Sequence, residues 1–370
     1  MCQPTSKNEI VGSFLRPIEL ITARADFETG KISEVELKAI EDKAIADLVE
    51  KQKDAKLAYY SDGEFRRSYW HLDFFWGLGN VERLEHERGY QFQGEETRKD
   101  SAALTGKLTF NPEHPVFEEF NYLATLVNKE QIRVSIPSPS QFLAELVRGV
   151  NEKKVIEFYE NREELYADIA KAYKQTILEL YELGLRHLKL DDCTWGMLVD
   201  KDFWKTMTGG DFDTAELQDL YLRVNNAALE DLPTDLIVTT HICRGNYHST
   251  WATKGGYEPV AENLFGKENV SAFFLEFDDE RSGGFEPLRH VPEDKHVVLG
   301  LVTSKNGELE DAEAIIERIQ EASKYVPLER LSLSPQCGFA STEEGNILTP
   351  EAQWEKIKLI TEISEKVWPI

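Results

Sequence analysis

The sequence of 370 residues predicts a (β/α)8 barrel, with residues 1–370 forming a single domain. Eight short runs of β-branched and aromatic residues recur along the chain, and stretches with helical periodicity separate them. Most of these runs are continuously apolar, which is typical of strands buried on both faces of a parallel sheet. A doubly wound sheet would show a similar alternation, and the length alone is compatible with one domain or two. The count of eight favours the barrel.

The first expected strand is Ile10–Phe14 and the second is Leu57–Tyr60, with a helix over Ser33–Lys56 between them. That helix has apolar residues at helical spacing, and Ser33 with Glu36 forms the Ser-x-x-Glu capping box that marks a helix start. The later strands are likewise apolar runs, and stretches with the amphipathic pattern of a helix follow them. The strands are Ile132–Ile136, Arg186–Asp191, Leu236–His241, Ala272–Phe277, His296–Val302 and Arg330–Ser334, and the clearest helices are Asn161–Leu183, Thr214–Leu229, Asp311–Tyr325 and Glu351–Val367.

Residues 65–129 interrupt this alternation and predict an insertion at the mouth of the barrel, after the second strand. The insertion carries the aromatic-rich stretch SYWHLDFFWGLG and two strand-like pieces, Tyr90–Gly94 and Leu108–Phe110. These pieces predict a hairpin, and a helix is expected near Val116–Val127. Packing decoration and a lid over the site are both open interpretations, because long inserted segments serve either purpose.

Charge and terminal composition exclude several classes of partner. The chain has 42 Lys and Arg against 67 Asp and Glu, which gives a net charge of −25. Such a surface repels a phosphate backbone, so nucleic acid is not expected as a partner. The N-terminal residues lack the pattern of a signal peptide, and no run of about 18 apolar residues occurs, so we expect a cytoplasmic protein without a membrane partner. The sequence leaves association into a homo-oligomer open.

Metal-ligating residue types follow three of the expected strands. His241 and Cys243 stand two apart at the end of the fifth strand, Glu276 ends the sixth, and Cys337 follows the eighth. In a barrel of this type the strand ends meet at one mouth, where the chemistry takes place. One imidazole, two thiols and one carboxylate suit Zn²⁺, which accepts N, S and O ligands in tetrahedral geometry. Ordinary buried residues are the alternative, because free cysteine is common in protein cores.

The segments HICRGN, FLEFDDE and SPQCGF, which contain these four residues, resemble the zinc-binding segments of the cobalamin-independent methionine synthase family. The resemblance extends to Val11–Phe14, to Asp62–Arg67 and to Leu190–Asp192, so it spans nearly the whole chain. It implies a catalytic barrel that binds Zn²⁺. It also implies that Glu64 and Asp191 hold the ammonium group of homocysteine and that Ser13 holds its carboxylate.

The sequence departs from the family's pattern in two respects. Full-length members have two barrels, whereas this chain has room for the catalytic one alone, so the methyl donor stays open between a folate, a methylated corrinoid protein and a small methyl compound. The family also has a histidine, thought to act as a general acid, after the seventh strand. Here that segment ends in Thr303-Ser304-Lys305, and Lys305 or an ordered water is expected to take the role.

The resemblance implies a zinc-dependent methyltransferase that methylates the thiol of homocysteine, or of a related thiol, to give methionine. Coordination would keep the sulfur deprotonated at neutral pH, where a free thiol with a pKa near 8.5 is a poor nucleophile. Two alternatives remain at this point. One is a lyase of the uroporphyrinogen decarboxylase type on the same barrel, and the other is a non-catalytic zinc-binding or thiol-binding protein, since four-ligand zinc sites are usually structural.

Overall fold

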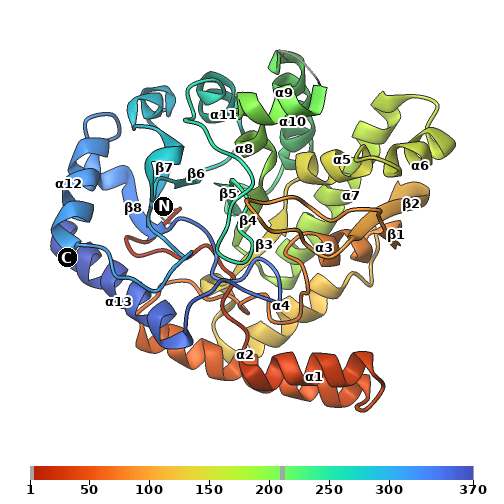
Figure 1. The fold of residues 1–370 in the computed structure, drawn as a ribbon, viewed down its shortest axis with the longest axis horizontal. Coiled ribbons are helices and arrows are strands. Elements are labelled where there is room, and N and C mark those ends of the chain that lie inside the picture. The colour runs from red at the N-terminus through yellow and green to blue at the C-terminus, as the bar shows by residue number, and fades with distance from the viewer. Residues whose placement is uncertain (1–3, 209–212, 370) are drawn as a thin grey trace.

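The computed structural model describes residues 4–208 and 213–369, and in these residues the strands form the centre of a (β/α)8 barrel. Six parallel strands pair in sequence order in one sheet, with helices around them (Figure 1). The strands are β3 (Arg133–Pro137), β4 (His187–Asp192), β5 (Ile237–Ile242), β6 (Ala272–Glu276), β7 (His296–Val302) and β8 (Leu331–Pro335). Parallel strands joined by helices bury both faces of the sheet, and all residues of β3, β4, β6 and β8 are buried.

The expected strands Ile10–Phe14 and Leu57–Tyr60 are extended segments with isolated bridges rather than regular strands. Asn8 pairs with Leu333 of β8, and Tyr60 pairs with Ile132 just before β3. The two segments contact each other where the backbone N–H of Phe14 donates to the carbonyl of Gly63, at 3.2 Å. Positive φ angles at Gly12 and Gly63 break the extended conformation, so the ladder cannot continue.

The helices that cover the barrel begin close to their expected positions. The capping box at Ser33 is present at the start of α2, where the Ser33 hydroxyl accepts from the backbone N–H of Glu36. The main helices are α1 (Ile18–Glu28), α2 (Glu34–Asp54), α5 (Pro139–Leu146), α6 (Asn151–Phe158), α7 (Arg162–Leu183), α8 (Thr194–Leu198), α9 (Lys201–Thr208), α10 (Ala215–Leu229), α11 (Ala261–Lys267), α12 (Ala312–Ala322) and α13 (Pro350–Val367). Short 3-10 helices lie at η1 (Lys129–Gln131), η2 (Glu280–Ser282), η3 (Glu286–His290) and η4 (Leu328–Arg330).

The segment 65–129 contains a short helix, an antiparallel hairpin and a longer helix. They are α3 (Leu72–Gly77), β1 (Gly79–Glu85), β2 (Asp100–Thr109) and α4 (Pro115–Leu126). The expected strand at Tyr90–Gly94 is wrong, because that piece lies in the connection between β1 and β2. The expected strand at Leu108–Phe110 falls on the last residues of β2. Charged residues on one exposed face of β1 hide it from a search for apolar runs.

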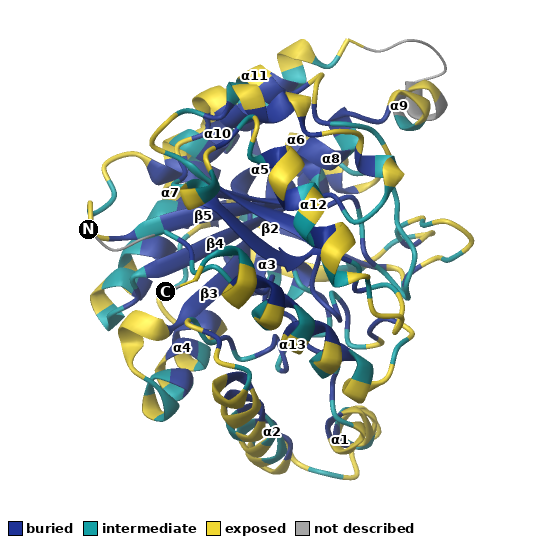
Figure 2. Cartoon of the chain, turned by 90° about the vertical axis from the view of Figure 1, so that its left-hand side faces the viewer, coloured by how far each residue is buried: buried dark blue, intermediate teal, exposed yellow. Residues whose placement is uncertain are grey.

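Buried apolar side chains form one contiguous core that extends from Ile10 to Ile363. The buried residues concentrate on the strands and on the inner faces of the helices, while the outer helix faces are exposed (Figure 2). The tip of the hairpin connection contacts the loop after β5, where the backbone N–H of Gln93 donates to the carbonyl of Trp251 at 3.0 Å. Within the described residues, no helix combines the length and the apolar composition that a membrane span requires.

Candidate metal centre

The structure brings His241, Cys243, Glu276 and Cys337 together at the carboxyl ends of the strands. His241 lies in β5, Cys243 follows it, Glu276 ends β6 and Cys337 follows β8. One ligand atom from each residue lies within 4.8 Å of the ligand atoms of the other three, and all four residues are buried. The two sulfur atoms are 3.7 Å apart. These distances bring four donors around one point, which is the arrangement that a tetrahedral ion requires.

His241 is oriented so that one ring nitrogen is available as a ligand. Its Nδ1 lies 3.3 Å from the carbonyl oxygen of Phe274, whereas its buried Nε2 has no hydrogen-bond partner in the described chain. Burial lowers the pKa of His241 to about 3, so the ring is neutral at pH 7. Because a carbonyl oxygen can only accept, Nδ1 carries the proton and Nε2 keeps its lone pair. A metal-binding histidine typically donates its other ring N–H to a carbonyl or carboxylate oxygen in this way.

The sulfur and carboxylate donors also have supporting contacts. The backbone N–H of Gly245 donates to Cys243 Sγ at 3.3 Å, and the backbone N–H of Arg244 donates to Glu276 Oε1 at 2.9 Å. Contact with the Cys243 thiol and burial raise the pKa of the Cys337 thiol well above its ordinary value. Burial likewise raises the pKa of Glu276. A cation among these four groups would offset the cost of deprotonating them, so the donor set fits Zn²⁺.

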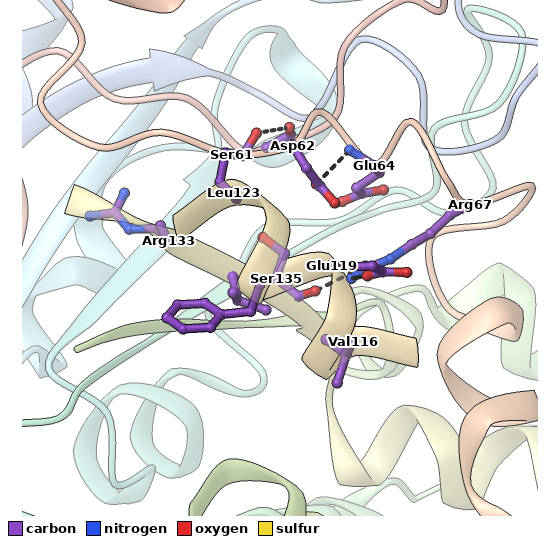
Figure 3. A pocket seen from close by; sticks show the side chains of 12 residues that line it. Ser61, Asp62, Glu64, Arg67, Val116, Glu119, Leu123, Arg133 and Ser135 are labelled. Carbon is purple, nitrogen blue, oxygen red and sulfur yellow. Dashed lines mark hydrogen bonds and ion pairs between the residues drawn. The ribbon is translucent and has the colours of Figure 1, made fainter. Parts of the chain in front are cut away.

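The candidate substrate residues Glu64 and Asp191 are both buried and both incompletely hydrogen-bonded. Glu64 Oε2 and Asp191 Oδ1 have no hydrogen-bond partner among the residues described. Burial raises the pKa of Glu64 to about 7, and the charge of Arg67 opposes this shift. Burial also raises the pKa of Asp191 to about 6, opposed first by Lys189 and then by Arg67. Figure 3 shows Glu64 beside Arg67 in a pocket between the 61–67 segment, α4 and β3. Two unpaired buried carboxylates can accept from an ammonium group.

Ser13 lies next to the segment that carries Cys337. Its hydroxyl accepts from the backbone N–H of Ala340 at 3.4 Å, and its carbonyl accepts from Phe339 N–H at 3.0 Å. A Cβ atom on Gly338 would stand 1.9 Å from Ser13 Oγ, so glycine is required for this close approach. Ser13 therefore lies against the turn that follows Cys337, and its neighbour Gly12 faces Glu64.

Lys305 lies beside the cluster rather than in it. Its ammonium group forms an ion pair with Asp278, two residues beyond Glu276, and Asp279 Oδ2 lies 3.8 Å away. The side chain is 11% exposed. Two carboxylates therefore hold the lysine that the sequence offers as a general acid.

Several groups near the cluster were not assigned a role from the sequence. The thiol of Cys193, after β4, lies against the Cys243 thiol. The guanidinium group of Arg281 stacks on Trp251, and its Nη2 lies 3.9 Å from Glu276 Oε2. Lys189, two residues before Asp191 on β4, is fully buried. The sequence could have indicated that Lys189 is near Asp191, because side chains two residues apart in a strand point to the same face.

Comparison with known proteins gives consistent results along the whole chain. The family model for the catalytic domain of cobalamin-independent synthase matches residues 4–350. Two uncharacterized Bacillus subtilis proteins, YxjG and YxjH, are each 43% identical to the chain. The alignments cover 99% and 97% of this chain and 96% and 93% of those proteins. A methionine synthase from Pyrococcus abyssi is 25% identical over 91% of this chain and 87% of its own length.

A solved structure is similar over its full length. The crystal structure of the putative vitamin-B12-independent methionine synthase from Listeria monocytogenes superposes with a TM-score of 0.78 at 37% identity, and the match covers 100% of both chains. A B12-independent methionine synthase from Shewanella has a TM-score of 0.72 at 18% identity, which supports the fold alone.

Proposed function

Because the chain belongs to the cobalamin-independent methionine synthase family, we propose that it is a zinc-dependent methyltransferase that converts homocysteine to methionine. The single observation that carries the metal assignment is the convergence of four ligand atoms within 4.8 Å of one another. Family membership favours this function over the lyase alternative. We further propose that the whole chain acts as one catalytic domain, with residues 65–129 at the barrel mouth.

In this proposal the chain's own side chains hold the metal and the amino acid. His241, Cys243, Glu276 and Cys337 bind Zn²⁺, and the neutral His241 ring donates through Nε2. When bound, zinc lowers the pKa of a coordinated thiol, so that the sulfur is a thiolate at neutral pH, and it fixes the position of that sulfur. The buried position of all four residues excludes water from the reacting sulfur.

The amino-acid end of homocysteine lies in the adjacent space inside the barrel. Glu64 and Asp191 accept from its ammonium group through their unpaired oxygens, and the backbone N–H and hydroxyl of Ser13 donate to its carboxylate. Asp191 and His241 are partners in the pairing of β4 with β5, so the ammonium site and the metal site are one strand apart. The thiol therefore reaches the metal while the other end stays fixed, which lowers the entropy cost of the reaction.

Metal analysis of the purified protein tests the proposed metal site. The wild type should contain about one zinc per chain, as a four-ligand site predicts. Cys243→Ser and Cys337→Ser should each lose most of it, whereas the matched control Cys193→Ser, which changes a neighbouring thiol outside the four, should retain it. Absence of metal from wild-type protein prepared without chelator would contradict the assignment.

A second experiment separates catalysis from metal storage. Zinc-loaded protein is mixed with homocysteine and with each donor class in turn, namely a methylated folate, a methylated corrinoid protein and a small sulfonium compound, and methionine is quantified. In the cobalt-substituted protein, homocysteine should change the visible spectrum, because its sulfur enters the coordination sphere. A purely structural site with four fixed ligands would give no methionine and no spectral change.

A further inference from the structure

The side-chain amine of Lys189 is buried and makes no hydrogen bond and no close ion pair in the described chain. Lys189 lies in the middle of β4, its side chain is fully buried, and no carboxylate of the described residues lies within 4.0 Å of Nζ. The ring of Phe274, 5.3 Å away, is its one cation–π contact. Burial lowers the pKa of Lys189, and the negative charge of Asp191 opposes this shift. A buried amine without a hydrogen bond is costly, so its retention here indicates that a ligand supplies the missing partner.

The ammonium group of Lys189 faces the space left by the missing side chain of Gly12. Nζ lies 3.5 Å from the position that a Cβ on Gly12 would occupy, Glu64 Oε1 lies 3.9 Å from the same point, and Ser135 Oγ lies 3.1 Å from it. The φ angle of +144° at Gly12 also disfavours any other residue. Gly12 is bonded to Ser13, so this space joins the candidate amino-acid site directly.

Lys189 and Glu64 therefore face one interior space, and Asp191 lies near enough to interact electrostatically with both. The cation is Lys189, and the anions are Glu64 and Asp191, each with one buried oxygen that lacks a hydrogen bond. Arg133, the nearby buried arginine, already forms an ion pair with Glu9 and is not available to a ligand. A ligand that satisfies all three groups must carry a cation and an anion close together, as a free α-amino acid does.

We infer that Lys189 is a substrate-binding residue that pairs with the α-carboxylate of the amino-acid thiol, while Glu64 and Asp191 take its ammonium group. This inference rests on the proposed function and extends it, since Ser13 alone would meet the carboxylate with neutral donors. Lys189 thereby makes the site specific for a zwitterionic acceptor over a thiol that carries only an amine.

The competing explanation is that Lys189 only offsets the charges of Glu64 and Asp191. The two explanations predict opposite effects of removing the charge. If Lys189 binds the carboxylate of the substrate, its removal takes away a binding partner, and the amino acid binds more weakly. If Lys189 only offsets the charges of Glu64 and Asp191, it competes with the ammonium group of the ligand for these carboxylates. Its removal then strengthens the binding of every thiol that carries an amine.

The experiment measures binding by calorimetry on zinc-loaded wild-type and Lys189→Met protein, with homocysteine and with 3-aminopropanethiol, which lacks the carboxylate. Lys189→Met should weaken homocysteine binding by about tenfold or more and leave 3-aminopropanethiol unchanged, since a charge-assisted pair is specific to the carboxylate. Lys356→Met, which removes another fully buried lysine, paired with Glu310 on the outer layer, serves as the matched control. It should bind both thiols as the wild type does.

Equal weakening of both thiols, tighter binding of both, or no change with either would overturn the assignment, as would wild-type protein that binds neither thiol. If Lys189→Met does not fold, Lys189→Gln and the wild-type affinity for homocysteine amide, whose carboxylate is neutralised, give the same comparison. If wild type binds homocysteine in the expected pattern but forms no methionine with any donor, the proposed reaction fails and the role of Lys189 stands.

Discussion

Replacement of Glu268 by glutamine should change how the stability of the protein depends on pH. Glu268 follows α11, is 1% exposed, and accepts from Asn225 Nδ2 at 2.9 Å through Oε1, whereas no partner of Oε2 is found in the described residues. Burial, and next the charge of Asp192, raise the pKa of Glu268 to about 8. The folded state therefore binds a proton that the unfolded state releases at lower pH.

The sign and the size follow from this difference. A carboxyl group with a raised pKa in the folded state contributes full stability below its ordinary pKa of 4.5, and this contribution is lost as the pH rises to about 8. At about 1.4 kcal/mol per pKa unit, the loss is on the order of 5 kcal/mol. Glutamine is neutral at every pH and keeps an oxygen that can accept from Asn225, so Glu268→Gln should not suffer this loss.

Urea unfolding of wild type and Glu268→Gln at a series of pH values between about 5 and about 9 measures the effect. The free-energy difference between the two proteins should change by several kcal/mol across this range, in favour of the variant at high pH. Glu262→Gln, at an exposed position on α11 just before Glu268, is the control, and its stability should depend on pH as that of the wild type does. Parallel curves for wild type and Glu268→Gln would refute the reasoning.

Three further predictions follow from buried contacts. Glu9→Gln leaves Arg133 without its charged partner in the barrel interior and should lower the free energy of unfolding by about 3 to 5 kcal/mol, with recovery on adding Arg133→Met; no loss in chemical denaturation would contradict this. Gly338→Ala forces the new methyl group onto Ser13 Oγ, so homocysteine binding should weaken by at least tenfold while the zinc content stays unchanged. Loss of zinc in this variant would instead show that the whole turn after Cys337 has been displaced. Homocysteine binding should weaken as the pH falls below about 7, because Glu64 becomes neutral there, and a binding isotherm independent of pH would count against its role.

The fold class and the family could be predicted from the sequence because both depend on local patterns. Apolar runs identify strands buried on both faces, and β3 to β8 fall on such runs. The hairpin strand β1 has one exposed, charged face, so the apolar criterion selected Tyr90–Gly94 instead. The segment Ile10–Phe14 has the composition of a strand, but the backbone at Gly12 interrupts the ladder, and composition does not reveal a φ angle.

The site shows the same division between local pattern and three-dimensional contact. Residue type and strand-end position selected the four candidate ligands, and the structure brings these together, although their role as ligands stays a prediction. The sequence could place Lys189 on the same strand face as Asp191, but it could not show that the buried amine lacks a hydrogen bond, because that depends on contacts in three dimensions. The ion pair that holds Lys305 also depends on a loop contact, with Asp278, that no spacing rule describes.

The candidate ligands come from three separate parts of the chain, and Cys337 stands 94 positions after Cys243. An ion bound by both would act as a cross-link that closes a long loop, and that loop contains β6, β7 and α12. A cross-link that closes a long loop reduces the conformational entropy of the unfolded chain more than one that closes a short loop. Metal binding should therefore slow amide hydrogen exchange across α12 as well as across β7, which pairs with the strand of Glu276, so that the zinc content would also set the local stability of the last third of the barrel.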